Sequence, residues 1–121
     1  PDSLEAPRPS EADACPDVFS SVTPIGPFVA QSGNLDAFEV FLFTENYRAE
    51  VVLDAGVSAE AIEMELYDAS GVLVASSTST GGTPSLTFLN GVSGGTYVLT
   101  VSAPGAAMCI PYELRSCKFS G

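Results

Sequence analysis

The chain has 121 residues, of which 45% are hydrophobic, and its four basic and fifteen acidic residues give a net charge of -11. A field of this sign repels phosphate backbones and anionic lipid headgroups, so it argues against nucleic acid as a partner. No window holds the roughly 18 apolar residues that a membrane-spanning helix needs. The chain also lacks histidine, which excludes Ser-His-Asp and Cys-His catalysis and histidine-containing zinc sites.

Residues 1–17 differ in composition from the rest of the chain. They contain four prolines and five acidic residues and few apolar side chains, so they have little to bury in a core of their own. We expect an extended acidic arm or linker over residues 1–17 and one β-sandwich domain over residues 18–121. An ordered arm must be held by its own domain, by a bond at Cys15 or by a neighbouring molecule.

Residues 18–30 alternate weakly between apolar and polar side chains and contain Pro24 and Pro27. Proline donates no ladder hydrogen bond, which excludes this segment from the middle of a sheet. We therefore expect an exposed edge strand, with Pro24 and Pro27 as candidates for an assembly contact.

The segment 36–43 predicts a strong strand in which alternate apolar residues from Phe38 to Leu42 share one face. Phe41 and Phe43 fall on the opposite face, which is too apolar for open water. We expect a loop, the arm or a partner to meet this second face, so Phe41 and Phe43 are further assembly candidates.

The next segments predict a strand at 48–55 and a hairpin formed by strand 61–68, a tight turn at 68–71 and strand 72–77. A period-2 pattern leaves no apolar residue of 61–68 misplaced, whereas a helix would spread its carboxylates around several sides. This pattern places Ile62, Met64 and Leu66 inward and Glu63, Glu65 and Tyr67 outward.

Three strands are predicted in the last third of the chain, at 85–89, at 95–102 and at 108–115, with the last one paired beside the one before it. In 95–102, Tyr97, Leu99 and Val101 share a face that we expect to be buried, and Val98, Thr100 and Ser102 share the other. Seven or eight strands at roughly ten-residue spacing predict an all-β fold, a single antiparallel β-sandwich.

Four segments also stand in a consistent order and spacing: 36–40 (D-A-F-E-V), 64–76 (M-E-L-Y-D-A-S-G-V-L-V-A-S), 95–101 (G-T-Y-V-L-T-V) and 112–114 (Y-E-L). On these segments, roughly residues 33–114 resemble the bacterial pre-peptidase C-terminal (PPC) domain family. The resemblance implies a small jelly-roll-like β-sandwich of the kind appended to secreted peptidases and other exported or surface proteins. It therefore implies an accessory, non-catalytic module.

Some members of that family bind calcium or matrix polymers, but this chain departs from the family pattern at its entry. Residues 11–17 stand where the family has an acidic Glu-Pro-Asn segment. The resemblance therefore assigns no calcium ligand to this chain. Glu11, Asp13 and Asp17 have spacings that could offer oxygen atoms to calcium. They lack a glycine turn and a glutamate at loop spacing, and a solvated linker is the alternative.

The carboxylates of Glu63 and Glu65 lie on one strand face roughly 7 Å apart by strand rise, a separation that glycosidases also use. No tryptophan is present to hold a sugar, and we interpret the pair as part of a solvated face. We expect no catalytic residue and no resident cofactor, with calcium left open.

Cys15, Cys109 and Cys117 are an odd number of cysteines, so at least one is free or bonded outside the chain in an oxidising compartment. On an extended strand Cys109 and Cys117 would lie about 26 Å apart, too far for a bond. Because first and last strands of sandwiches often neighbour each other, we predict that Cys15 pairs with Cys109 or Cys117.

The function expected from these observations is extracellular binding or positioning by a secreted or cell-surface, non-catalytic module. The chain begins without methionine, which we interpret as a processed secreted protein or an excised piece. Two alternatives remain open. One is a self-assembling subunit of an extracellular filament that uses its N-terminal arm, and the other is an accessory domain excised from a secreted hydrolase. The expected partner is a protein or a second copy of the chain, without membrane insertion.

Overall fold

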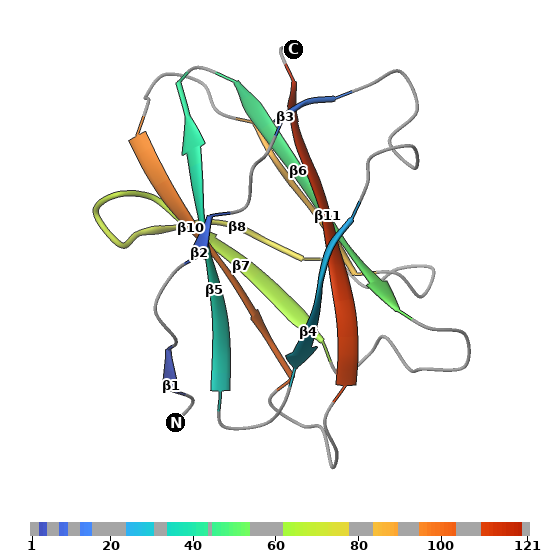
Figure 1. Cartoon of the computed structure of the whole chain (residues 1–121). Helices are drawn as coiled ribbons and strands as arrows, with labels where there is room; N and C mark the ends of the chain where they lie inside the picture. The colour runs from blue at the N-terminus through green and yellow to red at the C-terminus, as the bar shows by residue number, and fades with distance from the viewer. Residues whose placement is uncertain are drawn as a thin grey trace.

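A computed structural model describes residues 3–4, 8–9, 13–15, 24–30, 34–43, 45–53, 62–77, 84–89, 95–103 and 110–119. Eight of its strands form two antiparallel sheets that pack face to face (Figure 1). In order across the first sheet these strands are β5 (Asn34–Leu42), β10 (Gly95–Ser102), β7 (Glu63–Tyr67) and β8 (Leu73–Ser76). In the second sheet they are β4 (Ile25–Ala30), β11 (Ile110–Phe119), β6 (Asn46–Leu53) and β9 (Ser85–Phe88). The predicted all-β sandwich is confirmed.

The core lies between the sheets and is filled by alternate residues of their strands, as the period-2 patterns predict. The largest of these side chains are Tyr47, Phe38, Leu42, Ile62, Met64, Leu66, Leu86, Leu99, Leu114, Val40, Val51 and Val101. The inward faces predicted for 36–43, 61–68 and 95–102 are therefore confirmed. No helix long and apolar enough to cross a membrane occurs in the part of the chain described above.

One buried polar contact links the two sheets through the core. The Tyr112 hydroxyl on β11 donates a hydrogen bond to Asp36 Oδ2 on β5 at 2.6 Å, and both residues are buried. Phe28 packs against the rings of Phe38 and Tyr112, with centroids 5.0 and 5.6 Å away. The first and last of the four segments that carry the family resemblance therefore meet across the core.

The predicted pairing of the last strand beside the preceding one is wrong. β11 pairs with β6 and β4 in the second sheet, whereas β10 pairs with β5 and β7 in the first. Both edges of β10 are occupied by these partners, so a following strand has no place beside it. β11 also begins and ends later than the predicted segment, at Ile110 and Phe119.

The N-terminal arm contributes three two-residue strands, and all of them pair with this domain. β1 (Ser3–Leu4) and β2 (Arg8–Pro9) run parallel to β5 along its outer edge, and β3 (Asp13–Ala14) runs parallel to β11 (Figure 1). The Cys15 amide then donates to the Lys118 carbonyl oxygen at 2.8 Å. Of the ways to hold an ordered arm, this structure uses the flank of its own domain and a bond at Cys15.

Candidate binding groove

The outer face of the first sheet is hollow over its central strand. β10 presents the short side chains of Thr96, Val98 and Thr100 to this face, because alternate residues of a strand point to the same side. β7, and β5 near Thr96 and Val98, carry longer side chains at the same level, so the short residues form a floor between raised walls. We call this floor, together with its walls, the groove.

The strand register decides which side chains form the walls. On one side of β10, Tyr67 and Glu65 of β7 lie opposite Val98 and Thr100. Residues directly opposite in an antiparallel pair project from the same face of the sheet, so the Tyr67 ring stands beside the floor. On the β5 side, Phe41 lies opposite Thr96 and Glu39 opposite Val98, whereas the small, buried Ala37 lies opposite Thr100.

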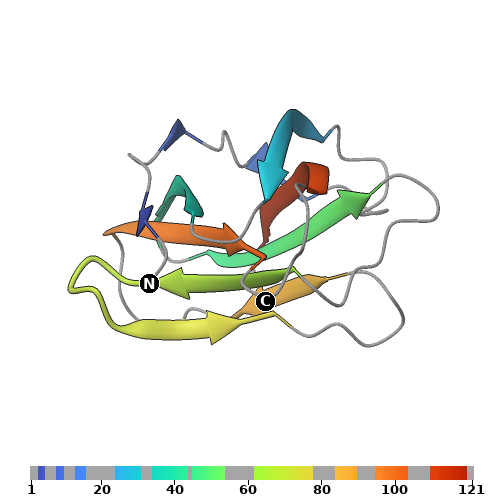
Figure 2. The ribbon, with the colours of Figure 1, turned by 90° about the horizontal axis from the view of Figure 1, so that it is seen from below.

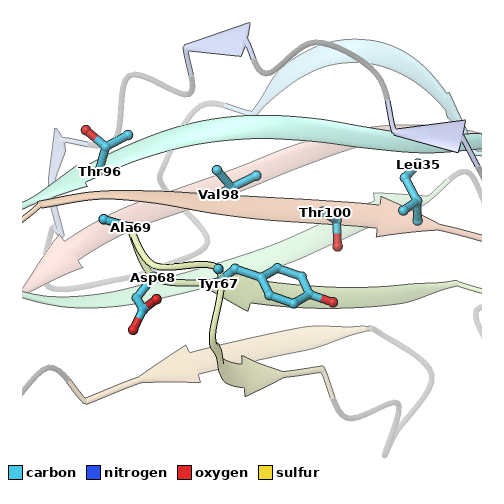
Figure 3. A pocket seen from close by; sticks show the side chains of 8 residues that line it. Leu35, Tyr67, Asp68, Ala69, Thr96, Val98 and Thr100 are labelled. Atoms are coloured by element: carbon cyan, nitrogen blue, oxygen red, sulfur yellow. The ribbon is translucent and has the colours of Figure 1, made fainter.

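The groove has a volume of about 590 Å³, within the range of ligand-binding pockets. Its two ends are formed by the turn between β7 and β8 and by Leu35 on β5 (Figure 3). In Figure 3 the Tyr67 ring extends from the end of β7 along the face below Thr100. The lining residues are Leu35, Tyr67, Asp68, Ala69, Gly71, Thr96, Val98 and Thr100.

The turn that closes one end of the groove is fixed by its own hydrogen bonds. Asp68 Oδ1 accepts from the backbone amides of Ser70 and Val72, both at 2.9 Å. The Gly71 amide donates to the Asp68 carbonyl oxygen at 3.0 Å, and Gly71 has a φ of 83°, a left-handed conformation that favours glycine. Figure 2 shows this turn projecting beyond the ends of β7 and β8.

Tyr67 is held in place by the neighbouring carboxylate. Its hydroxyl donates a hydrogen bond to Glu65 Oε1 at 2.8 Å. This hydrogen bond, assisted by partial burial and by the charge of Glu65, raises the pKa of Tyr67 above its ordinary value of 10.0. A phenol is neutral at physiological pH, so the Tyr67 ring presents an uncharged aromatic wall to the groove.

The carboxylates predicted from the sequence have different positions. Glu63 is exposed on the face that carries the groove, and Glu65 bonds to Tyr67. Glu11 and Asp17 lie outside the described residues, and Asp13 is described only through the pairing of β3. The described part of the chain contains no group of three or more Cys, Asp or Glu residues that could hold a metal ion. Calcium binding by residues 11–17 stays a prediction.

Cys15 and Cys117 form a disulfide, which confirms one of the two predicted pairings. The bond joins the residue that follows β3 to β11, so it fixes the end of the arm to the second sheet. Cys109 lies outside the described residues.

The assembly candidates lie at two places. Pro27 belongs to β4, which pairs only with β11 among the described strands, and Pro24 immediately precedes β4. The edge strand predicted over 18–30 is therefore confirmed over 25–30, and residues 18–23 lie outside the described part of the chain. Phe41 and Phe43 remain 60% and 69% exposed. Phe41 continues the groove face, since it lies directly opposite Thr96.

The alternation in the sequence predicts outward positions for Tyr67, Val98 and Thr100 but does not predict that they form one site. The only signal was a strand whose outward residues are short, together with a neighbour whose outward residues are long. A groove follows from that signal only when the two strands are known to be adjacent. That adjacency comes from the sheet order β5-β10-β7-β8.

Comparison with known proteins supports the fold. No protein-family model and no curated protein matches the sequence. The structure is similar to the crystal structure of the pre-peptidase C-terminal domain of a collagenase from Bacillus anthracis, with a TM-score of 0.62 and 17% sequence identity over 96% of each chain. The chain therefore has a PPC-like β-sandwich fold, as the sequence resemblance implied.

Proposed function

We propose that this chain is a secreted or cell-surface, non-catalytic module that binds an extracellular partner through the groove on its first sheet. The observation that carries the proposal is the groove itself, which has a floor of short side chains, an aromatic wall at Tyr67 and a volume of about 590 Å³. An aromatic side chain beside a few polar groups in a concave site is typical of ligand recognition.

Two further features support a binding role outside the cell. A PPC-like fold occurs as one domain of a collagenase, so it is compatible with attachment to a larger exported protein. The Cys15–Cys117 disulfide is of the kind that persists in oxidising compartments. The absence of histidine from the sequence leaves carboxylates as the main acid-base groups, and Glu65 already accepts the Tyr67 hydroxyl.

The test is cosedimentation of the purified chain with insoluble cellulose, chitin and a fibrous extracellular protein. We expect retention on at least one polymer and loss of retention in Tyr67→Ala, which removes the aromatic wall. The same preparations are assayed for hydrolysis of protein and glycan substrates, with no turnover expected. Turnover that disappears in Glu63→Gln or Glu65→Gln would contradict a non-catalytic role.

A second candidate is an accessory domain excised from a secreted hydrolase. It is favoured by the similarity to one domain of a collagenase. The sequence of the parent gene product tests it. A product that continues into a catalytic domain supports this candidate, whereas one that consists of a signal peptide followed by these residues excludes it.

Self-assembly through the arm remains a separate prediction. Its support is the exposure of Phe41 and Phe43, while the pairing of the arm with its own domain favours the alternative of a monomer. Deletion of residues 1–14 separates the two. If the arm assembles the protein, light scattering detects oligomers of the full chain that are lost on deletion, and a full chain that stays monomeric at high concentration contradicts assembly.

A further inference from the structure

We propose that the groove accepts an extended protein segment that carries lysine or arginine side chains. This inference rests on the proposed binding function and adds the chemical class of the partner. It follows from the charge around the groove, from the aromatic ring in its wall and from its alignment along a strand.

The face that carries the groove is acidic. Glu39 lies opposite Val98, Glu63 opposite Ser102 and Glu65 opposite Thr100, and Asp68 lines the groove at the turn. Among the described side chains, lysine and arginine occur at Arg48, Arg115 and Lys118 on the second sheet, and the backbone of Arg8 lies on β2 beside β5 of the first. A cationic segment is therefore attracted to the groove face, and the net charge of -11 favours its approach from a distance.

Glu50 on the second sheet and Glu65 on the groove face have different partners. On the second sheet, Glu50 Oε1 forms an ion pair with Arg115 Nη1 at 2.7 Å. On the groove face, Glu65 accepts a hydrogen bond from a neutral phenol, and no described side chain forms an ion pair with it. A lysine or arginine side chain from a partner would supply a cation.

The Tyr67 ring adds a second interaction for the same kind of ligand. An ammonium or guanidinium group is attracted to the face of an aromatic ring, and tyrosine is an effective partner. The ring is fixed by the bond from its hydroxyl to Glu65, so ring and carboxylate stand together at one wall of the groove. A cation between them would contact both.

The floor has the shape for an extended chain. Thr96, Val98 and Thr100 are successive outward residues of β10, and they span about 13 Å by strand rise. An extended segment repeats its side chains with the same period of two residues, so alternate side chains can lie against the Tyr67 and Glu65 wall. The exposed Phe41 at the Thr96 end offers an apolar contact to the same segment.

The experiment is a titration of the isotope-labelled full chain, followed by amide NMR shifts. The probes are three capped peptides of alternating sequence with lysine, glutamate or glutamine at every second position, and a glucosamine oligomer as a cationic sugar. We expect the lysine peptide to shift the amides of Tyr67 and of β10 between Thr96 and Thr100. We also expect this binding to weaken as salt is raised, since salt screens exposed charges.

Matched variants then test the contacts. Glu65→Gln should lower the affinity for the lysine peptide about two- to fivefold, the range for one exposed charge pair. Tyr67→Ala should lower this affinity by a similar factor because the aromatic ring is lost. Glu113→Gln removes a carboxylate from β11 on the other sheet and should leave the affinity unchanged. These results together would support the proposal.

Three outcomes would overturn it. Equal binding of the glutamine peptide would show that the groove binds without selecting cations, and the proposed binding function would stand without this inference. Shifts spread over β6 and β11 would show charge attraction without a groove site. Tighter binding of the glucosamine oligomer in the groove would assign the cation to a polysaccharide instead of a protein.

Discussion

The four tyrosines of this chain show how one residue type takes different roles at different depths. Tyr112 is buried and donates to Asp36, whereas Tyr67 lines the groove and donates to Glu65. Tyr97 packs against Phe88 with ring centroids 5.3 Å apart. Tyr47 is fully buried, and its hydroxyl makes no hydrogen bond; Ser116 lies nearby, but the two groups lack hydrogen-bond geometry.

A matched pair of substitutions tests this difference. Tyr112→Phe removes the donor to a buried carboxylate and should lower the free energy of unfolding by about 1–3 kcal/mol. Tyr47→Phe removes a buried hydroxyl that has no hydrogen bond to lose, so stability should stay unchanged or rise. Urea unfolding of both variants measures the two effects. A larger loss for Tyr47→Phe than for Tyr112→Phe would contradict the hydrogen-bond assignments.

Alkaline pH should destabilise the protein through the same tyrosines. Burial raises the pKa of Tyr47, and the bond to Glu65 raises that of Tyr67. Because the pKa is higher in the folded state, the folded state keeps the tyrosine proton to higher pH than the unfolded state does. The free energy of unfolding is therefore at its full value below pH 10 and falls as the pH rises through the pKa values of the folded state. Urea midpoints at about pH 8 and about pH 11 measure the fall, and it should be smaller in Tyr47→Phe. Equal falls in wild type and variant would contradict this origin.

At the scale of the strands, the sequence allowed prediction wherever alternation alone decides the structure. The alternation places Ile62, Met64 and Leu66 inward because each is separated from the next by one polar residue. The position of β11 could not be predicted in this way, since its alternation fits either sheet. Its partners were decided by which strand edges remain open after β10 has paired with β5 and β7, a property of the assembled sheets.

The disulfide is the main covalent link between the arm and the sandwich. Cys15 and Cys117 are 102 residues apart in sequence, and a bond across so long a loop strongly restricts the unfolded chain. Replacing both by alanine should lower the free energy of unfolding by about 2–5 kcal/mol. Reduction of the wild type breaks the bond but keeps the Cys117 side chain, so it controls for packing lost in the alanine variant. It should produce most of the fall in the urea midpoint that the alanine variant shows. Unchanged midpoints in both would contradict a stabilising bond.

At the scale of the whole molecule, the outer faces of the two sheets carry different side chains. The first sheet combines short residues on β10 with Tyr67 and carboxylates on the flanking strands, and the second carries the Arg115–Glu50 ion pair. The sequence showed the outward direction of Tyr67, Val98 and Thr100. It could not show the groove, because the groove depends on β7 and β5 lying on the two sides of β10.

If the module binds through the groove face, a bulky substitution on that face should disturb binding and one on the opposite face should not; an exposed threonine is present on each. Thr96 lies on the groove floor and Thr87 on β9 of the opposite sheet. Thr96→Trp should fill the groove and weaken retention on the polymer that binds the wild type by about tenfold, equivalent to 1.4 kcal/mol, while Thr87→Trp should retain wild-type binding. Equal binding by both variants, or a loss confined to Thr87→Trp, would contradict binding through the groove face.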